Sequence, residues 1–114
     1  MIRGYHIHLY YTDDSRQSAA AIRERLVEQE IAVTVGPMRD LPVGPHPIGQ
    51  FLATVDAARL EPALRWFMWN RGSHLALLHP NSGDEVLDHS ARAVWLGGEP
   101  LSLDHSKLDS AAAR

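Results

Sequence analysis

The first strand-like stretch of the chain separates histidines from apolar residues. Residues 4–11 are rich in aromatic and β-branched side chains, which favour a β-strand. Successive side chains along a strand point to opposite faces of the sheet, so every second residue of this stretch shares a face. One face would carry His6, His8 and Tyr10, and the other Tyr5, Ile7, Leu9 and Tyr11. We therefore predict a strand with one histidine-bearing face.

Beyond this strand, the spacing of apolar residues predicts two helices and three more strands. Asp13-Asp14-Ser15 is a helix-start signal, and Gly72 is a stop signal for the second helix. The predicted buried stripes are Ala19, Ile22, Leu26 and Val27 in the first helix and Leu60, Leu64, Phe67 and Met68 in the second. Short apolar runs predict strands at residues 31–35, 48–55 and 75–78, while residues 91–96 fit either a strand or a turn of helix. Residues 36–47 form an irregular loop, since they hold four prolines and two glycines.

The element order is β-α-β-β-α-β with a C-terminal extension, which predicts an α+β, ferredoxin-like sandwich. In such a fold the two helices cover one face of the sheet. The other face would stay open for a partner subunit, so we predict a dimer through that face. The first strand would be central, between a parallel third strand and an antiparallel fourth strand.

Composition narrows the range of functions. A chain of 114 residues is one domain, and its net charge of −3, with basic residues in no block or stripe, argues against a nucleic-acid partner. No apolar run reaches membrane-spanning length and no signal peptide is visible, which predicts a cytoplasmic protein without a membrane partner. There are no cysteines but seven histidines. A transition metal would therefore use histidine and carboxylate ligands, which suits Fe(II), Mn, Ni or Zn.

The predicted topology brings distant histidines to one end of one sheet face. His79 follows the apolar run 75–78, where Pro80 is expected to end the strand, and His46 precedes the third strand. We expect both to approach His6 and His8, and the four imidazoles could hold a metal. The alternatives are a solvated loop for His46, a turn-bonded His79, and two strand histidines on an exposed or subunit-facing surface.

Several segments stand out in order along most of the chain: Tyr5-His6-Ile7-His8-Leu9-Tyr10-Tyr11, Gly44-Pro45-His46-Pro47, the helix end at residues 66–72, His79-Pro80-Asn81-Ser82-Gly83-Asp84, Asp88-His89 and Trp95-Leu96-Gly97. Together they resemble the motifs of the DOPA 4,5-dioxygenase family, a group of small fungal and bacterial extradiol enzymes. The resemblance implies a ferredoxin-like subunit, a dimer, and metal-dependent ring-opening oxygenation of catechols such as L-DOPA. We assign residues 1–105 to a single domain of this type and residues 106–114 to a frayed tail.

The resemblance implies that the motif histidines form the site, and their predicted positions lead to hypotheses for the roles of individual residues. The predicted metal ligands are His6, His46 and His79, with Fe(II) as the native ion and Zn(II) possible in the purified protein. Catechol and O2 would be the small-molecule partners. His8 is predicted to be a ligand or base, and His89 a proton shuttle or a residue that orients a ligand. Tyr10 is either a substrate-pocket residue or a packing residue. Asp84 and Asp88 either orient the ligands or serve the turn as caps.

The Fe(II) oxygenase arrangement includes a carboxylate ligand, yet no acidic residue lies on the predicted histidine face. Either Asp84 or Glu85 supplies it from a loop, or the site contains histidines alone. Two other functions stay open. The chain could be a non-catalytic ferredoxin-like dimer that binds a metal or small ligand, or a structural dimerising module whose histidines are incidental. Metal content and oxygen uptake with catechols would separate these.

Overall fold

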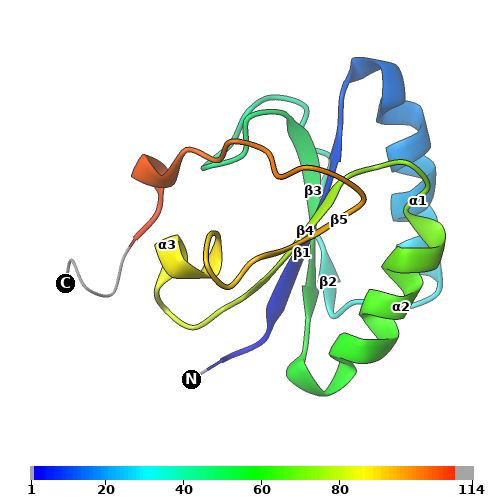
Figure 1. Ribbon diagram of the computed structural model, residues 1–114. Helices are drawn as coiled ribbons and strands as arrows, with labels where there is room; N and C mark the ends of the chain where they lie inside the picture. The colour runs from blue at the N-terminus through cyan, green and yellow to red at the C-terminus, as the bar shows by residue number, and fades with distance from the viewer. Residues whose placement is uncertain (1, 110–114) are drawn as a thin grey trace.

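The computed structural model describes residues 2–109 as one five-stranded sheet with two long helices packed on one of its faces (Figure 1). Within this range no helix has the length and apolar character needed to cross a membrane. The strands are β1 (Tyr5–Tyr11), β2 (Thr34–Val35), β3 (Gly49–Val55), β4 (Ala76–Pro80) and β5 (Val94–Leu96). The α-helices are α1 (Arg16–Glu28), α2 (Leu60–Asn70) and α3 (Glu85–Asp88), and the 3-10 helices are η1 (Asp13–Ser15), η2 (Ala57–Arg59) and η3 (His105–Lys107).

The strand order is β2-β3-β1-β4-β5, and every neighbouring pair is antiparallel. β1 is central, as predicted, but the prediction that β1 and β3 run parallel is wrong. The helical crossover from β1 through α1 returns the chain in the same direction, so β2 runs parallel to β1. β3 then pairs antiparallel with β2, and it must therefore also run opposite to β1.

This direction decides where each histidine reaches the sheet. The start of β3 lies beside the end of β1, with Gly49 opposite Tyr11. The loop that carries His46 therefore arrives near Tyr10, rather than near the start of β1. On the other side of β1, His79 lies directly opposite His6. β4 continues through His79 and Pro80 instead of ending before them.

The apolar face of β1 packs against α1 and α2 to form the core. Ile7 and Leu9 are fully buried there, and Tyr11 is nearly so. The helices contribute Ala19, Ile22 and Leu26 from α1 and Ala63, Trp66 and Phe67 from α2. The predicted burial of two stripe residues was wrong, because Val27 is 48% exposed and Met68 is 50% exposed. Each directly follows a buried residue, and one step along a helix turns the side chain by about 100°.

The opposite face of the sheet was predicted to be open, but the chain covers much of it. α3 and the C-terminal segment cross this side of the molecule (Figure 1), and His8, Tyr10 and His79 are buried beneath them. The backbone N–H of Asp104 donates to the carbonyl of Pro45 at 2.9 Å, which ties this segment to the loop before β3.

The predicted frayed tail, residues 106–114, begins within η3. The backbone N–H of Asp109 donates to Glu85 Oε2 at 2.9 Å, which holds the end of the described segment against α3. Residues 110–114 lie outside the part of the chain that the structure describes.

Candidate metal centre

Histidines from four parts of the chain meet on the covered face of the sheet. β1 supplies two of them, β4 a third, the loop before β3 a fourth, and the residue after α3 a fifth. The ring centroids of His8 and His46 are 4.1 Å apart, those of His79 and His89 are 3.9 Å apart, and those of His6 and His79 are 5.1 Å apart. The structure therefore brings together all five histidines of the family-like motifs.

Two sets of three have their ligand nitrogens within 4.8 Å of one another. One set is His6, His8 and His79, and the other is His8, His46 and His89. His8 belongs to both, whereas the predicted ligand trio of His6, His46 and His79 is divided between them. Neither of these sets, among residues 2–109, includes a carboxylate.

Hydrogen bonds behind the rings fix the tautomers of three of these histidines. His8 Nδ1 lies 2.8 Å from Gln50 Oε1, His79 Nδ1 lies 2.9 Å from the Pro80 carbonyl, and His89 Nδ1 lies 2.8 Å from the Glu85 carbonyl. Carbonyl and amide oxygens accept hydrogen bonds and donate none. Each Nδ1 must therefore carry the proton, and each neutral ring presents a free lone pair at Nε2.

Two of these lone pairs face each other. His8 Nε2 and His79 Nε2 are 3.1 Å apart, yet neither carries a hydrogen when both rings are neutral. Such a contact is unfavourable unless a cation lies between the nitrogens. Two imidazole nitrogens bound at about 2.0–2.1 Å to one tetrahedral ion lie about 3.4 Å apart. The donor set therefore fits a metal ion with only a small adjustment, and the hydrogen-bonded Nδ1 atoms are typical of metal-binding histidines.

Burial keeps these imidazoles in the neutral form that binds metals. It lowers the pKa of His8 well below its ordinary value, with help from the neighbouring histidines. Burial, and then the neighbouring His89, lower the pKa of His46 to about 4 and that of His79 to about 3. The pKa values of His6 and His89 are also lowered, mainly by burial.

Tyr10, expected either to line a substrate pocket or to pack, is buried in this structure, with an exposed fraction of 2%. Its hydroxyl oxygen lies 2.7 Å from His46 Nδ1, and its ring stacks on that of Trp95 with the centroids 5.8 Å apart. Burial raises the pKa of Tyr10, so the phenol keeps its proton. Tyr10 thus lies behind His46 as a hydrogen-bond partner.

Asp84 and Asp88, predicted to orient the ligands, both bond within the turn around α3. Asp84 caps α3 by accepting from the Leu87 N–H at 3.2 Å. Asp88, exposed by only 2%, accepts from the Ser82 N–H at 2.8 Å and from the Ser82 hydroxyl at 2.7 Å. Arg92 adds an ion pair with Asp88 at 3.1 Å. These bonds hold the turn that carries His89.

Sequence reasoning missed Gln50 and did not place His74. Gln50 lies opposite Tyr10 in the β1–β3 pair and is buried, 4% exposed, against His8. An amide side chain within the mostly apolar run 48–55 was the available signal. His74 is also buried, but it bonds to the Tyr10 carbonyl through Nδ1 and to the Ser18 hydroxyl through Nε2, each at 2.9 Å. It supports the fold outside the cluster.

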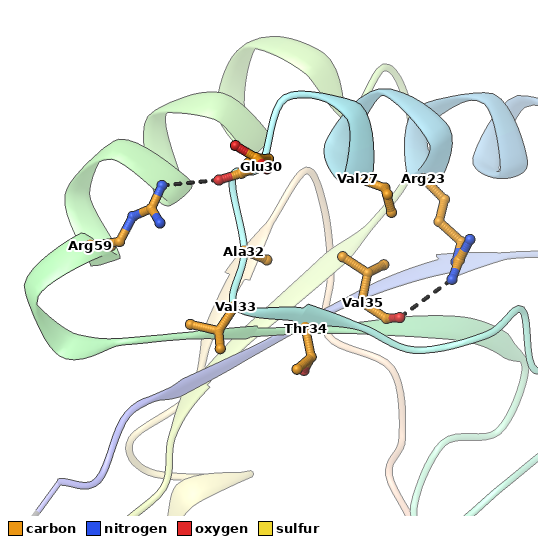
Figure 2. A pocket seen from close by; sticks show the side chains of 8 residues that line it. All are labelled: Arg23, Val27, Glu30, Ala32, Val33, Thr34, Val35 and Arg59. Atoms are coloured by element: carbon orange, nitrogen blue, oxygen red, sulfur yellow. Dashed lines mark hydrogen bonds between the residues drawn. The ribbon is translucent and has the colours of Figure 1, made fainter.

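One hollow lies away from the histidine cluster. It measures about 660 Å³ and is bordered by α1, β2 and Arg59, with Arg23 and Arg59 donating to backbone carbonyls (Figure 2). Two smaller hollows adjoin the histidines. One of about 540 Å³ is lined by His46 and Lys107, and one of about 420 Å³ is lined by His89 and Trp95. Both offer access to the cluster from the surface.

Comparison with known proteins agrees with the resemblance seen in the sequence. A model described as the Dopa 4,5-dioxygenase family matches residues 5–107. An uncharacterised 21.2 kDa protein of Botryotinia fuckeliana is 32% identical over 117 residues, which cover 92% of this chain and 63% of that protein. The DOPA 4,5-dioxygenase of Amanita muscaria is 27% identical over 118 residues, which cover 96% of this chain and 52% of that enzyme.

The chain therefore spans between about half and two thirds of the length of these two fungal relatives. A crystal structure from Nostoc punctiforme, described as a "putative dioxygenase", matches with a TM-score of 0.87 and 36% identity, over 93% of this chain and 90% of that one. With nearly its whole described length matched by the family model, the chain belongs to the Dopa 4,5-dioxygenase family.

Proposed function

We propose that the protein is a metal-dependent extradiol dioxygenase that opens the ring of catechols such as L-DOPA. The observation that carries this proposal is the 3.1 Å contact between His8 Nε2 and His79 Nε2, with both Nδ1 atoms held by acceptor oxygens. This arrangement supports a bound cation, and membership of a dioxygenase family supports the use of that cation with O2 and an aromatic substrate.

We assign the ion to His6, His8 and His79, one of the two convergent sets. The ligand set predicted from the sequence had His46 in place of His8. Imidazole ligands suit Fe(II) and Zn(II) alike, and a set without a carboxylate makes Zn(II) a plausible occupant of purified protein. When bound, Fe(II) would lower the pKa of a catechol hydroxyl and supply the redox chemistry with O2.

The hollow beside His89 and Trp95 suits the aromatic substrate. Its volume of about 420 Å³ is within the range of small-molecule sites, and Trp95, Leu101 and Leu103 give it an apolar lining. His89 borders it with a lone pair at Nε2, since its Nδ1–H donates to the Glu85 carbonyl. His89 Nε2 could therefore accept the proton that a catechol hydroxyl loses on binding.

We also propose a ferredoxin-like fold and a homodimer. The strand order, and the two helical connections that each pass over one intervening strand, support the fold assignment. The dimer is a separate prediction, which light scattering on the purified protein would test by its mass.

Oxygen uptake with catechols tests the proposed activity. Protein loaded anaerobically with Fe(II), mixed with L-DOPA and then exposed to air should consume O2 and form a yellow, visible-absorbing product. The His79→Ala variant should lose this activity, whereas the His74→Gln variant, which removes a histidine outside the cluster, should keep it when folded. Tight metal binding without O2 uptake for any catechol would favour the non-catalytic binding protein. Failure to bind Fe(II) and Zn(II) would favour the structural module.

A further inference from the structure

The hydrogen bond behind His46 differs in kind from those behind its neighbours. His8, His79 and His89 each direct Nδ1 toward an oxygen that only accepts. His46 Nδ1 instead lies 2.7 Å from the Tyr10 hydroxyl, which can donate. The proton on the His46 ring therefore depends on which way this hydrogen bond runs.

The surroundings of Tyr10 determine that direction. Its side chain is 2% exposed, and His46 Nδ1 is the hydrogen-bond partner of its hydroxyl among the described residues. If His46 donated to Tyr10, the phenol proton would be left without an acceptor in a buried place, which folded proteins avoid. The Tyr10 O–H therefore donates to Nδ1. A neutral His46 ring must then carry its own proton on Nε2.

From this tautomer we infer that His46 is a hydrogen-bond donor to an anionic oxygen ligand at the metal centre, rather than a metal ligand, and that Tyr10 positions it. One His46 nitrogen lies within 4.8 Å of ligand nitrogens of His8 and His89, and the residue also lines the hollow of about 540 Å³. The inference rests on the proposed metal site and assigns His46 a role there that differs from that of His8 and His79.

The chemistry of the proposed reaction gives such a donor a use. A catechol that loses a proton carries negative charge on oxygen, and O2 gains negative charge as it is reduced. A fixed N–H near these oxygens stabilises the charge without reorganisation, an effect that is commonly about 10²–10³-fold in rate for one donor. A lone pair at the same place would repel them.

Nitrogen NMR on histidine-labelled protein tests the tautomer without any activity. In metal-free protein at neutral pH, His46 should carry its proton on Nε2, while His8, His79 and His89 carry theirs on Nδ1. His74 is an internal control, since its Nδ1 donates to the Tyr10 carbonyl and should carry the proton. On addition of Zn(II), the Nε2 signals of His8 and His79 should shift as ligands, and His46 should keep its Nε2–H. An Nδ1–H tautomer for His46, or ligation by His46, would overturn the inference.

Metal affinity provides a second test that separates this inference from the proposed function. We expect His79→Ala to weaken Zn(II) binding at least 100-fold, and His46→Ala to change it less than about fivefold. Tyr10→Phe should leave Zn(II) affinity in place but release the fixed tautomer of His46 in the NMR spectrum. If the wild-type protein binds no Zn(II), the proposed metal site fails. If it binds Zn(II) and His46→Ala loses as much affinity as His79→Ala, the metal site stands and the donor role is wrong.

Discussion

The atom that accepts a hydrogen bond from Nδ1 of an imidazole determines whether Nε2 has a lone pair that can bind a metal. The Gln50 side chain holds the His8 Nδ1–H at 2.8 Å, and the Pro80 carbonyl holds that of His79 at 2.9 Å. Both rings then present lone pairs to the same place, and the metal proposal depends on this. The Tyr10 hydroxyl instead donates to His46 Nδ1, so the proton of the neutral His46 ring lies on Nε2.

The acceptor for His8 is a side chain, that of Gln50, whereas the acceptor for His79 is a backbone carbonyl. The role of Gln50 can therefore be tested by substitution. Gln50→Leu removes the acceptor, so His8 loses its fixed tautomer and the metal affinity should fall about 10–100-fold. Gln50→Glu keeps an acceptor oxygen and serves as the matched control, with affinity near the wild-type value or above. Isothermal titration with Zn(II) measures both. Equal affinities for the leucine variant and the wild type would contradict this role for Gln50.

At the scale of elements, the short helix α3 and the turn before it bring His89 to the cluster. Asp88 is the centre of this turn, since it accepts three hydrogen bonds from Ser82 and Arg92 while nearly fully buried. We expect Asp88→Ala to lower the free energy of unfolding by about 1–3 kcal/mol, because the buried donors of Ser82 lose their acceptor.

Arg92→Gln is the control for that substitution. The Arg92 side chain is 46% exposed, so its ion pair with Asp88 should contribute less than about 1 kcal/mol. Urea denaturation of both variants measures the two effects. A loss for Arg92→Gln as large as that for Asp88→Ala would show that the ion pair, rather than the bonds from Ser82, holds the turn.

The periodicity of apolar residues predicted individual helices and strands better than it predicted the directions in which neighbouring strands pair. The alternation along residues 4–11 correctly separated His6 and His8 from the core residues Ile7 and Leu9, because the period of a strand is fixed by its geometry. The direction of β3 was wrong, because the pattern within a strand contains no information on its neighbour. His46 lies beside Tyr10 because β3 runs antiparallel to β1, so this position was not predicted.

The roles of the individual histidines were harder to predict from the sequence than the fold. Which nitrogen of an imidazole carries the proton depends on backbone carbonyls such as those of Pro80 and Glu85, and these look alike at every position of a sequence. Topology predicted the convergence of His6, His8, His46 and His79, but it placed His46 by a wrong direction of β3. His89 was expected near them only from the family-like motifs. The separate positions of His8 and His46 could not be predicted.

At the scale of the whole molecule, the metal-free protein contains buried neutral histidines and should lose stability in acid. Burial and neighbouring histidines lower the pKa of His46 to about 4 and that of His79 to about 3, and that of His8 well below 6.5. The unfolded chain takes up protons near pH 6.5 while the folded chain does not. Stability should therefore be full above about pH 6.5 and decrease as the pH falls toward 4, by about 1.4 kcal/mol per pH unit for each such histidine.

Urea denaturation of metal-free protein between pH 7.5 and pH 5 measures this slope. His79→Leu removes one of the buried histidines, so its slope should be smaller by about one proton. Identical slopes for the variant and the wild type, or a stability independent of pH over this range, would contradict the assignment of buried neutral imidazoles. Added Zn(II) should raise stability at pH 7.5, and this gain should disappear in acid as protons compete for the same nitrogens.

We propose that imidazoles from distant segments bind one ion on the covered face of the sheet. Anomalous X-ray diffraction at the zinc edge, from crystals grown with Zn(II), would locate this ion. We expect a single strong peak about 2.0–2.1 Å from His8 Nε2 and His79 Nε2, with His6 as a further ligand. A zinc peak located elsewhere, or none between these two nitrogens at full metal loading, would contradict it.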